Sequence, residues 1–237
     1  CMMSILLLMA TQVRSQTTHI VDNNPNTAAD FTDLQNAINA AADNDTIYVQ
    51  QSDIDYGNIT LNKSLIIIGR SHNDSSYKSQ VNDITIPSDG SNSTIKGLDI
   101  LKIEEDTVLN ETLSNLEIID CEINAVRLNP NPFSGQDGFL NNILLKGNIV
   151  LGAIRIRANN VEIINNVIRN HTFSDVSISP SSTIFSNNIV TGSYEFILYG
   201  TGGLLTISNC IFVTESGSTE TINFDLDPLH DVEVINS

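Results

Sequence analysis

Three of the chain's six arginines carry chemistry that could recognise an anion. Arg127, Arg155 and Arg157 each offer a planar guanidinium group, which binds carboxylate or sulfate through two parallel hydrogen bonds. Arg127 and Arg155 both stand between two apolar residues, in the segments 126–128 and 154–156. In a β-strand, such alternation turns the apolar neighbours inward and the arginines outward.

Aligning successive repeats places Arg127 and Arg155 on adjacent rungs of a parallel sheet, about 5 Å apart. Like charges at that separation repel, so a bound anion would stabilise them. Acids flank the arginines, and one tyrosine offers a stacking surface for a sugar. The alternative is that these side chains project into solvent or pair with nearby acids, as most surface charges do. The residues expected to form the surface are Arg127, Arg155, Arg157, Asp175, Glu195 and Tyr199.

The alignment rests on a repeat of about twenty-two residues, most regular in segments 161–168, 183–190 and 205–212. Each copy has alternating apolar residues, then two small polar residues, then two more apolar ones. Repeats of this length predict a solenoid, in which each coil buries its apolar face against the next. Further copies have their polar pair at residues 69–70, 97–98, 120–121, 147–148 and 236–237.

Two columns of apolar residues recur at fixed distances from the polar pair, and they predict the core of the solenoid. The first residue of each pair is Gly, Asn or Asp, the types that tolerate a left-handed backbone at a sharp corner. Counted from that first residue, the column two positions before it contains Ile67, Ile95, Ile118, Leu145, Ile163, Phe185, Ile207 and Val234; the column three positions after it contains Ile100, Ile123, Val150, Ile168, Val190 and Phe212; the corner positions themselves are Gly69, Gly97, Asp120, Gly147, Asn165, Asn187, Asn209 and Asn236.

The second residue of the pair is Asn148, Asn166 and Asn188 in three consecutive coils. Here the chain resembles the right-handed parallel β-helix proteins of the pectin-lyase-like superfamily, whose coils often carry a stacked asparagine ladder at a corner. The resemblance covers most of the chain after about residue 19. It implies an all-β fold, a single-stranded right-handed parallel β-helix, with a structural ladder at these three positions.

The resemblance leaves activity open, because that superfamily includes lyases, hydrolases, esterases, phage tailspikes and adhesins. A lyase would use Arg155 as the base, often with Ca²⁺ held by clustered carboxylates, but no tight acidic cluster is readable near Arg155. Gly135-Gln136-Asp137 resembles an esterase motif, yet the following residues depart from it and a second catalytic segment is missing. No metal or cofactor is expected, apart from Ca²⁺ in the lyase alternative.

Charge narrows the range of partners. The formal net charge is −17 and the sequence has no lysine or arginine cluster, which argues against nucleic acid and anionic membranes. Cys121 and Cys210 align in the corner column four rungs apart, on the order of 19 Å. That separation excludes a disulfide between them.

The N-terminal region predicts export followed by a capped first coil. Residues 2–10 form an apolar run of signal-peptide length, so we interpret residues 1–16 as the remnant of a signal peptide. No other membrane-spanning segment is expected. Apolar residues at helical spacing and a Thr32–Gln35 capping box predict a helix over 30–42 that covers the open end of the solenoid.

These observations predict a single domain over residues 17–237, truncated or continuing at its C-terminus, in a secreted or cell-surface protein. The leading hypothesis is a carbohydrate-associated β-helix that binds an anionic polysaccharide or cell-surface glycan without catalysis. A polysaccharide lyase or related pectin-active enzyme is one alternative. A structural stalk or adhesin segment is the other.

Overall fold

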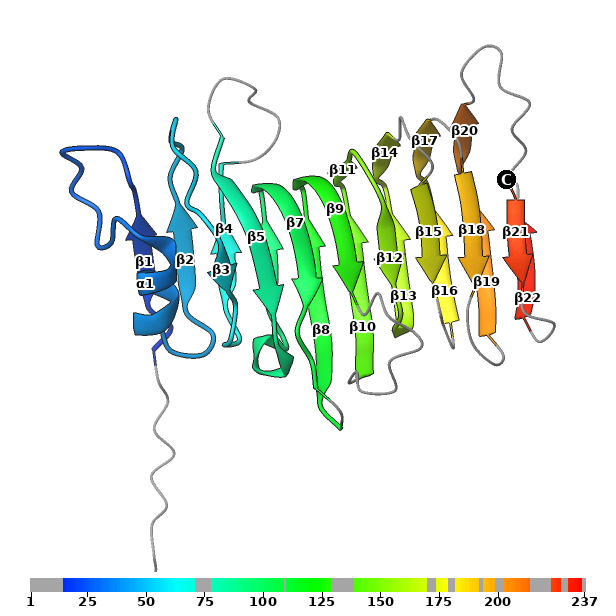
Figure 1. Ribbon diagram of the computed structural model, residues 1–237, viewed down its shortest axis with the longest axis horizontal. Helices are drawn as coiled ribbons and strands as arrows, with labels where there is room; N and C mark the ends of the chain where they lie inside the picture. Colours follow the sequence, from blue (N-terminus) through cyan, green and yellow to red (C-terminus); the bar gives the residue numbers. More distant parts are fainter. Residues whose placement is uncertain are drawn as a thin grey trace, which may run out of the picture.

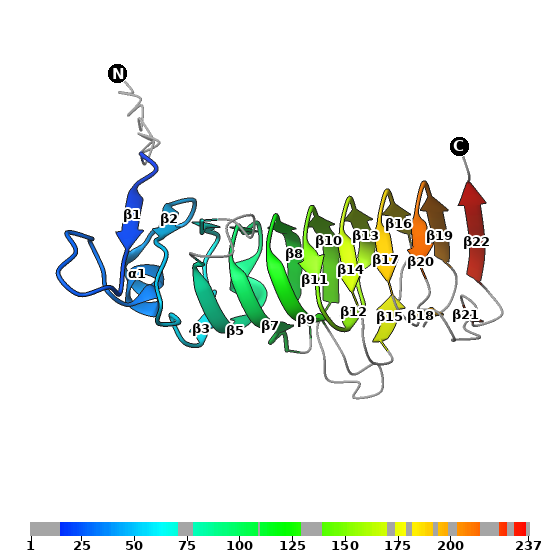
Figure 2. The ribbon, with the colours of Figure 1, turned by 90° about the horizontal axis from the view of Figure 1, so that it is seen from above.

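The computed structural model describes residues 15–70, 78–108, 110–128, 139–169, 174–178, 182–191, 194–198, 203–213, 223–226 and 230–235. Its strands stack side by side along one long axis as two parallel sheets, which makes the chain a parallel β-solenoid (Figures 1 and 2). Within these ranges, the first sheet contains ten strands and the second contains twelve.

From β2 to β11 the strands alternate between the two sheets, and after that each coil adds two short strands to the second sheet, as expected for coils that wind around a common core. The first sheet consists, in order, of β1 (Thr18–Val21), β2 (Thr46–Val49), β4 (Ile66–Ile68), β6 (Thr94–Lys96), β8 (Thr112–Ile119), β10 (Phe139–Lys146), β13 (Asn159–Ile164), β16 (Ser182–Ser186), β19 (Gly203–Ser208) and β22 (His230–Ile235). The second consists of β3 (Ile59–Thr60), β5 (Gln80–Ile86), β7 (Asp99–Glu105), β9 (Glu122–Leu128), β11 (Ile149–Val150), β12 (Ile154–Ile156), β14 (Val167–Arg169), β15 (Ser174–Ile178), β17 (Ile189–Thr191), β18 (Tyr194–Leu198), β20 (Ile211–Val213) and β21 (Asn223–Leu226).

The second sheet divides into two branches at β9. The first half of β9 pairs with β11, and its second half pairs with β12. Gly152 lies between these two short strands, where a Cβ atom would collide with the carbonyl oxygen of Asn124. Glycine therefore allows the backbone to pass close to β9 at the division.

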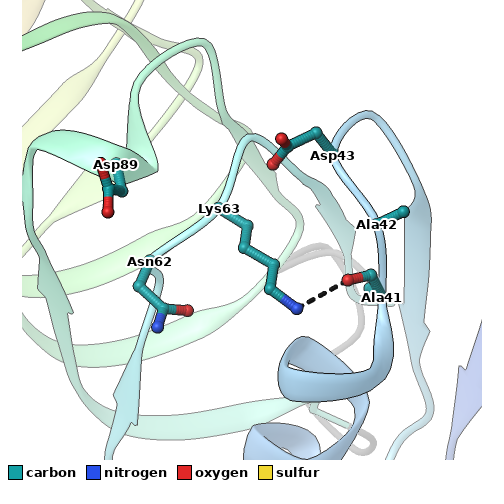
Figure 3. Close-up of a pocket in the computed structure, with 6 residues that line it drawn as sticks. All are labelled: Ala41, Ala42, Asp43, Asn62, Lys63 and Asp89. Carbon is teal, nitrogen blue, oxygen red and sulfur yellow. Dashed lines mark hydrogen bonds between the residues drawn. The ribbon is translucent and has the colours of Figure 1, made fainter.

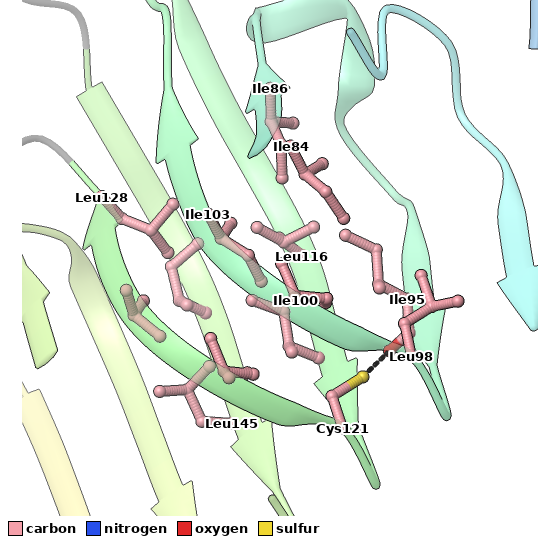
Figure 4. Packing of buried hydrophobic residues seen from close by; sticks show 14 of the residues in the cluster. Ile84, Ile86, Ile95, Leu98, Ile100, Ile103, Leu116, Cys121, Leu128 and Leu145 are labelled. Atoms are coloured by element: carbon pink, nitrogen blue, oxygen red, sulfur yellow. Dashed lines mark hydrogen bonds between the residues drawn. The ribbon is translucent and has the colours of Figure 1, made fainter. Parts of the chain in front are cut away.

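The predicted inner columns form the core, which Figure 4 shows in its central part. In the column before the corner, every residue from Ile67 to Ile207 is buried. Val234 is the exception, with 64% of its surface exposed, because β22 is the last described strand of the first sheet and, among those strands, pairs with β19 alone. In the second column, Phe212 is only partly buried, on the corresponding last strand β20.

The corner column also follows the prediction, with one correction. Positive φ angles occur at Gly97, Asp120, Gly147, Asn165, Asn187 and Asn209. Gly69 does not have one, so the prediction of a left-handed corner there is wrong. Glycine is required at position 69 for a different reason, since a Cβ atom would lie 2.5 Å from the carbonyl oxygen of Gly97.

The predicted helix is shorter than the sequence pattern suggested. Helix α1 (Leu34–Ala40) lies at the β1 end of the stack and contacts β1, β2 and β3. Its N-cap is Asp33, whose carboxylate accepts from the backbone N–H of Asn36 at 2.7 Å, so the prediction that Thr32 begins the capping box is wrong. Gln35 instead bonds the backbone of Thr60, which fastens the helix to β3.

Candidate functional site

The predicted arginine surface has its backbone framework in β9 and β12. These strands pair in register, with Arg127 directly opposite Arg155. The residues on either side of both arginines are buried, so the arginine side chains project from the outer face. Arg157 follows directly after β12, and its backbone N–H donates to the carbonyl of Leu128 at 3.0 Å. We call Arg127, Arg155 and Arg157 the arginine face.

The sign of the charge changes where the arginine face begins. β9 also pairs with β7, and that register places Glu104 of β7 directly opposite Arg127. The carboxylate of Glu104 lies 3.0 Å from the Nζ of Lys102, which also lies 3.1 Å from a carboxylate oxygen of Asp83. Hydrogen bonds to Glu104 and Asp83 raise the pKa of Lys102. Glu104 is therefore already engaged by a lysine on its own strand.

A second lysine joins the preceding rungs in the same way. Lys78 Nζ lies 2.9 Å from Asp99 of β7 and 3.0 Å from Glu122 of β9. Burial lowers the pKa of Lys78, but its hydrogen bonds to the two carboxylates outweigh that effect and raise the pKa. Among the described residues, no ion pair joins Arg127 or Arg157 to an acid.

The flanking acids occupy a column beside the arginines. Asp175 of β15 and Glu195 of β18 are opposite one another in the register. They come two positions before Ser177 and Ile197, the residues that continue the Arg127–Arg155 column. Tyr199, the expected stacking residue, belongs to a segment outside the described ranges.

The predicted asparagine ladder is present and buried. Asn148, Asn166 and Asn188 are each at most 1% exposed. Each Nδ2 donates to a backbone carbonyl of a neighbouring strand, at 2.8–3.0 Å. The Oδ1 atom of each asparagine accepts from the backbone N–H of the equivalent residue one coil earlier in the chain. The donors to Asn148, Asn166 and Asn188 are Cys121, Asn148 and Asn166, respectively. The ladder thus fixes the corner of three consecutive coils.

Both internal cysteines are free thiols at the two ends of this ladder. Cys121 Sγ lies 3.7 Å from the carbonyl oxygen of Ile95, and Cys210 Sγ lies 3.5 Å from that of Phe185 (Figure 4 shows Cys121). Each of these carbonyls comes two positions before the corner of the preceding coil. The amide nitrogen of Asn188 bonds the carbonyl at the same position, that of Ile163. The cysteines replace asparagine as weak donors at the ends of the column.

A second row of asparagines lies on an exposed corner and was missed in the sequence. The Nδ2 of each member donates to the Oδ1 of the member before it, at 2.8, 2.8 and 3.0 Å. All four members are exposed and left-handed, with φ from 54° to 62°. We call Asn92, Asn115, Asn142 and Asn160 the outer asparagine row. The signal was available, because each member comes five residues before a predicted corner at 97, 120, 147 or 165.

An open hollow of about 390 Å³ lies near the end of α1 (Figure 3). Its cation is Lys63, whose Nζ donates to the carbonyls of Ile38, Asn39 and Ala41 at 2.7–3.0 Å. The ammonium group thereby caps the C-terminal end of the helix. These three hydrogen bonds use all three donors of the Lys63 ammonium group. We therefore assign the hollow a structural role and not a binding role.

No family model, curated protein or solved structure matches this chain. The parallel β-solenoid fold is therefore established by the strand pairing itself. Within the ranges that the structure covers, no group of three or more His, Cys, Asp or Glu side chains could hold a metal ion. No helix in those ranges has the length and apolar character needed to cross a bilayer.

Proposed function

We propose that this chain is an exported β-helix protein that binds an anionic polysaccharide on the arginine face without cleaving it. The observation that carries the proposal is the in-register pairing of Arg127 with Arg155. Two guanidinium groups one rung apart repel each other, and an anionic group shared between them would remove that repulsion. Uronates and sulfated sugars supply such groups.

The surrounding charges favour an external anionic polymer as the ligand of the arginine face. The neighbouring acids Glu104 and Glu122 are held by Lys102 and Lys78, respectively. The arginine face thus brings three guanidinium groups together in a chain of net charge −17. A polyanion would be repelled by most of the surface and attracted here, which would restrict where it binds.

We infer a right-handed helix of the pectin-lyase-like kind, in which α1 covers the first coil. Leu34, Ala37 and Ile38 of α1 are fully buried, which supports a capping role for the helix. The apolar run at residues 2–10 supports export, and hence a secreted or cell-surface location.

The test measures binding of the full chain to polygalacturonate and to a sulfated polysaccharide at several salt concentrations. We expect Arg155→Ala to weaken binding about tenfold and to reduce its salt dependence, because a charge-assisted contact is lost. Arg169→Ala is the matched control, since Arg169 is an exposed arginine on β14, in the other branch of the sheet. Equal affinity of wild type and Arg155→Ala would overturn the assignment.

The same incubations distinguish the alternatives. Unsaturated fragments detected by mass spectrometry, with or without added Ca²⁺, would establish a lyase with Arg155 as the candidate base. Absence of both binding and cleavage would favour a structural stalk or adhesin segment.

A further inference from the structure

The outer asparagine row has hydrogen-bonding capacity that the protein leaves unused. A primary amide has two N–H donors and two acceptor positions. Asn115 and Asn142 each use one donor and one acceptor within the row, and among the described residues their side chains make no other hydrogen bond. Each exposed amide therefore presents one free donor beside one free acceptor.

The buried ladder shows what a purely structural asparagine does in this fold. Asn166 donates Nδ2 to the carbonyls of Leu145 and Ile164 and to Oδ1 of Asn188. Its hydrogen-bonding capacity is consumed by the protein, as expected for a buried amide. The outer row has the same residue type on successive rungs but directs half of its capacity to solvent.

The row is also rigid before any ligand arrives. Its left-handed backbone and its chain of side-chain hydrogen bonds fix each amide in one orientation. Successive members are one strand apart, about 4.8 Å, which is close to the length of one sugar ring. Because the amides are already ordered, a ligand that bonds to them loses little conformational entropy from the protein side.

The row lies beside the arginine face. Asn160 comes three residues after Arg157, and an extended chain of three residues spans at most about 11 Å. The turn between them is held in place, since Ala158 is buried with 4% exposure and Arg157 N–H is bonded to Leu128. The Arg127–Arg155 column and the row both run along the solenoid axis, across the strands.

We propose that the outer asparagine row binds the hydroxyl groups of a linear polysaccharide lying along the solenoid axis, with one sugar ring per rung. A sugar hydroxyl both donates and accepts, which matches the free donor and acceptor of each amide. The inference rests on the proposed function, because the carboxylates or sulfates of the same polymer would meet the arginine face. The ligand class is thus an anionic polysaccharide with free hydroxyls on the side opposite its acid groups.

The experiment compares polygalacturonate with its carboxyl-reduced form, which keeps the hydroxyls and lacks the charge. Binding of both polymers to the full chain is measured by calorimetry at several salt concentrations. The test variant is Asn115→Gly/Asn142→Gly, because glycine keeps the left-handed backbone and removes the amide. The matched control is Asn165→Gly/Asn187→Gly, which alters two exposed left-handed asparagines on the other corner. If the test variant has a lowered unfolding midpoint, the single variant Asn160→Gly at the end of the row replaces it.

We expect the test variant to bind both polymers about tenfold more weakly, with unchanged salt dependence, because the lost hydrogen bonds are between neutral groups. The control should bind like wild type. The proposal would be overturned if the test variant bound both polymers as tightly as the wild type does. It would also be overturned if the wild type bound neither polymer.

The outcomes separate this inference from the proposed function. If Arg155→Ala weakens binding of polygalacturonate but the row variant binds like wild type, the arginine face stands and the row is overturned. If Arg155→Ala has no effect and the row variant loses affinity for both polymers, the row is supported and the arginine face fails.

Discussion

The Oδ1 atom of Asn166 accepts both donors of Asn148, the backbone N–H at 2.9 Å and Nδ2 at 3.1 Å. Asn188 receives the same two bonds from Asn166, at 2.8 and 3.1 Å. Each asparagine therefore organises the corner of the coil before its own. This relationship explains why three identical residues occur in register at a position with at most 1% exposure.

Replacing the middle member should weaken the whole corner. In Asn166→Leu the carbonyl of Leu145 and the backbone N–H of Asn148 lose their partners within the core. We expect the free energy of unfolding to fall by about 1–3 kcal/mol, since unpaired buried polar groups keep their desolvation cost. Urea titration followed by circular dichroism measures the change. Asn165→Gly, at the adjacent exposed corner, is the control, and equal midpoints for wild type and Asn166→Leu would show that the ladder contributes nothing.

The two ladder-end thiols should differ in reactivity. Burial raises the pKa of Cys121 to about 12, and Cys121 is completely buried. Burial also raises the pKa of Cys210, which is only partly buried. Because the thiolate is the reactive form, we expect iodoacetamide to label Cys210 slowly in the native protein and Cys121 only after denaturation.

Peptide mapping of a Cys1→Ser background gives the two labelling rates separately. Labelling of Cys121 at the same rate as Cys210 in native buffer would contradict the burial of this corner.

Thr183 is a site where the core is not optimal. It occupies the inner column of β16 between Val161 and Leu205, and its buried Oγ1 has no hydrogen-bond partner among the residues that the structure describes. Thr183→Val keeps the shape and removes the unpaired hydroxyl, so we expect it to raise the free energy of unfolding by about 1 kcal/mol. Thr206→Val, on the partly exposed outer face of β19, should change the urea midpoint little. A lower midpoint for Thr183→Val would mean that the hydroxyl is bonded in solution.

The sequence predicted the parts of the fold that repeat in every coil. Inner columns such as Ile118 and Leu145 were readable because each coil buries the same positions, and the corner residue Asp120 was readable because few residue types tolerate a left-handed backbone. Gly69 was misassigned because glycine satisfies two needs, a positive φ and a close backbone approach, and the sequence does not distinguish them.

The outer asparagine row was missed for a related reason. Asn115 and Asn142 lie within long strands, so apolar alternation on both sides conceals the bend that their positive φ produces. The arginine face was only partly readable. Its register follows from the repeat, but the lysine bridges that occupy Glu104 and Glu122 join residues on three strands and leave no signal in one repeat.

Acid should loosen the first coil through Asp45, a carboxylate with only 5% exposure. Asp45 accepts from the backbone N–H groups of Thr17 and Ala42, both at 2.8 Å, and lies 3.3 Å from Nε2 of His19. Burial raises the pKa of Asp45, but these hydrogen bonds and His19 outweigh burial and lower the pKa below its ordinary value of 3.8. The folded protein therefore binds this proton less readily than the unfolded chain does.

The stabilisation by Asp45 is accordingly present above the ordinary pKa of 3.8 and is lost as the pH falls through the lowered value. We expect Asp45→Asn to lower the urea midpoint at neutral pH, and we expect the gap between variant and wild type to close in acid. Unfolding titrations from about pH 6 to about pH 2 measure the gap. Asp53→Asn, at an exposed carboxylate in a neighbouring loop, is the control. A gap that stays constant over the whole range would show that the ionised carboxylate does not stabilise the start of the solenoid.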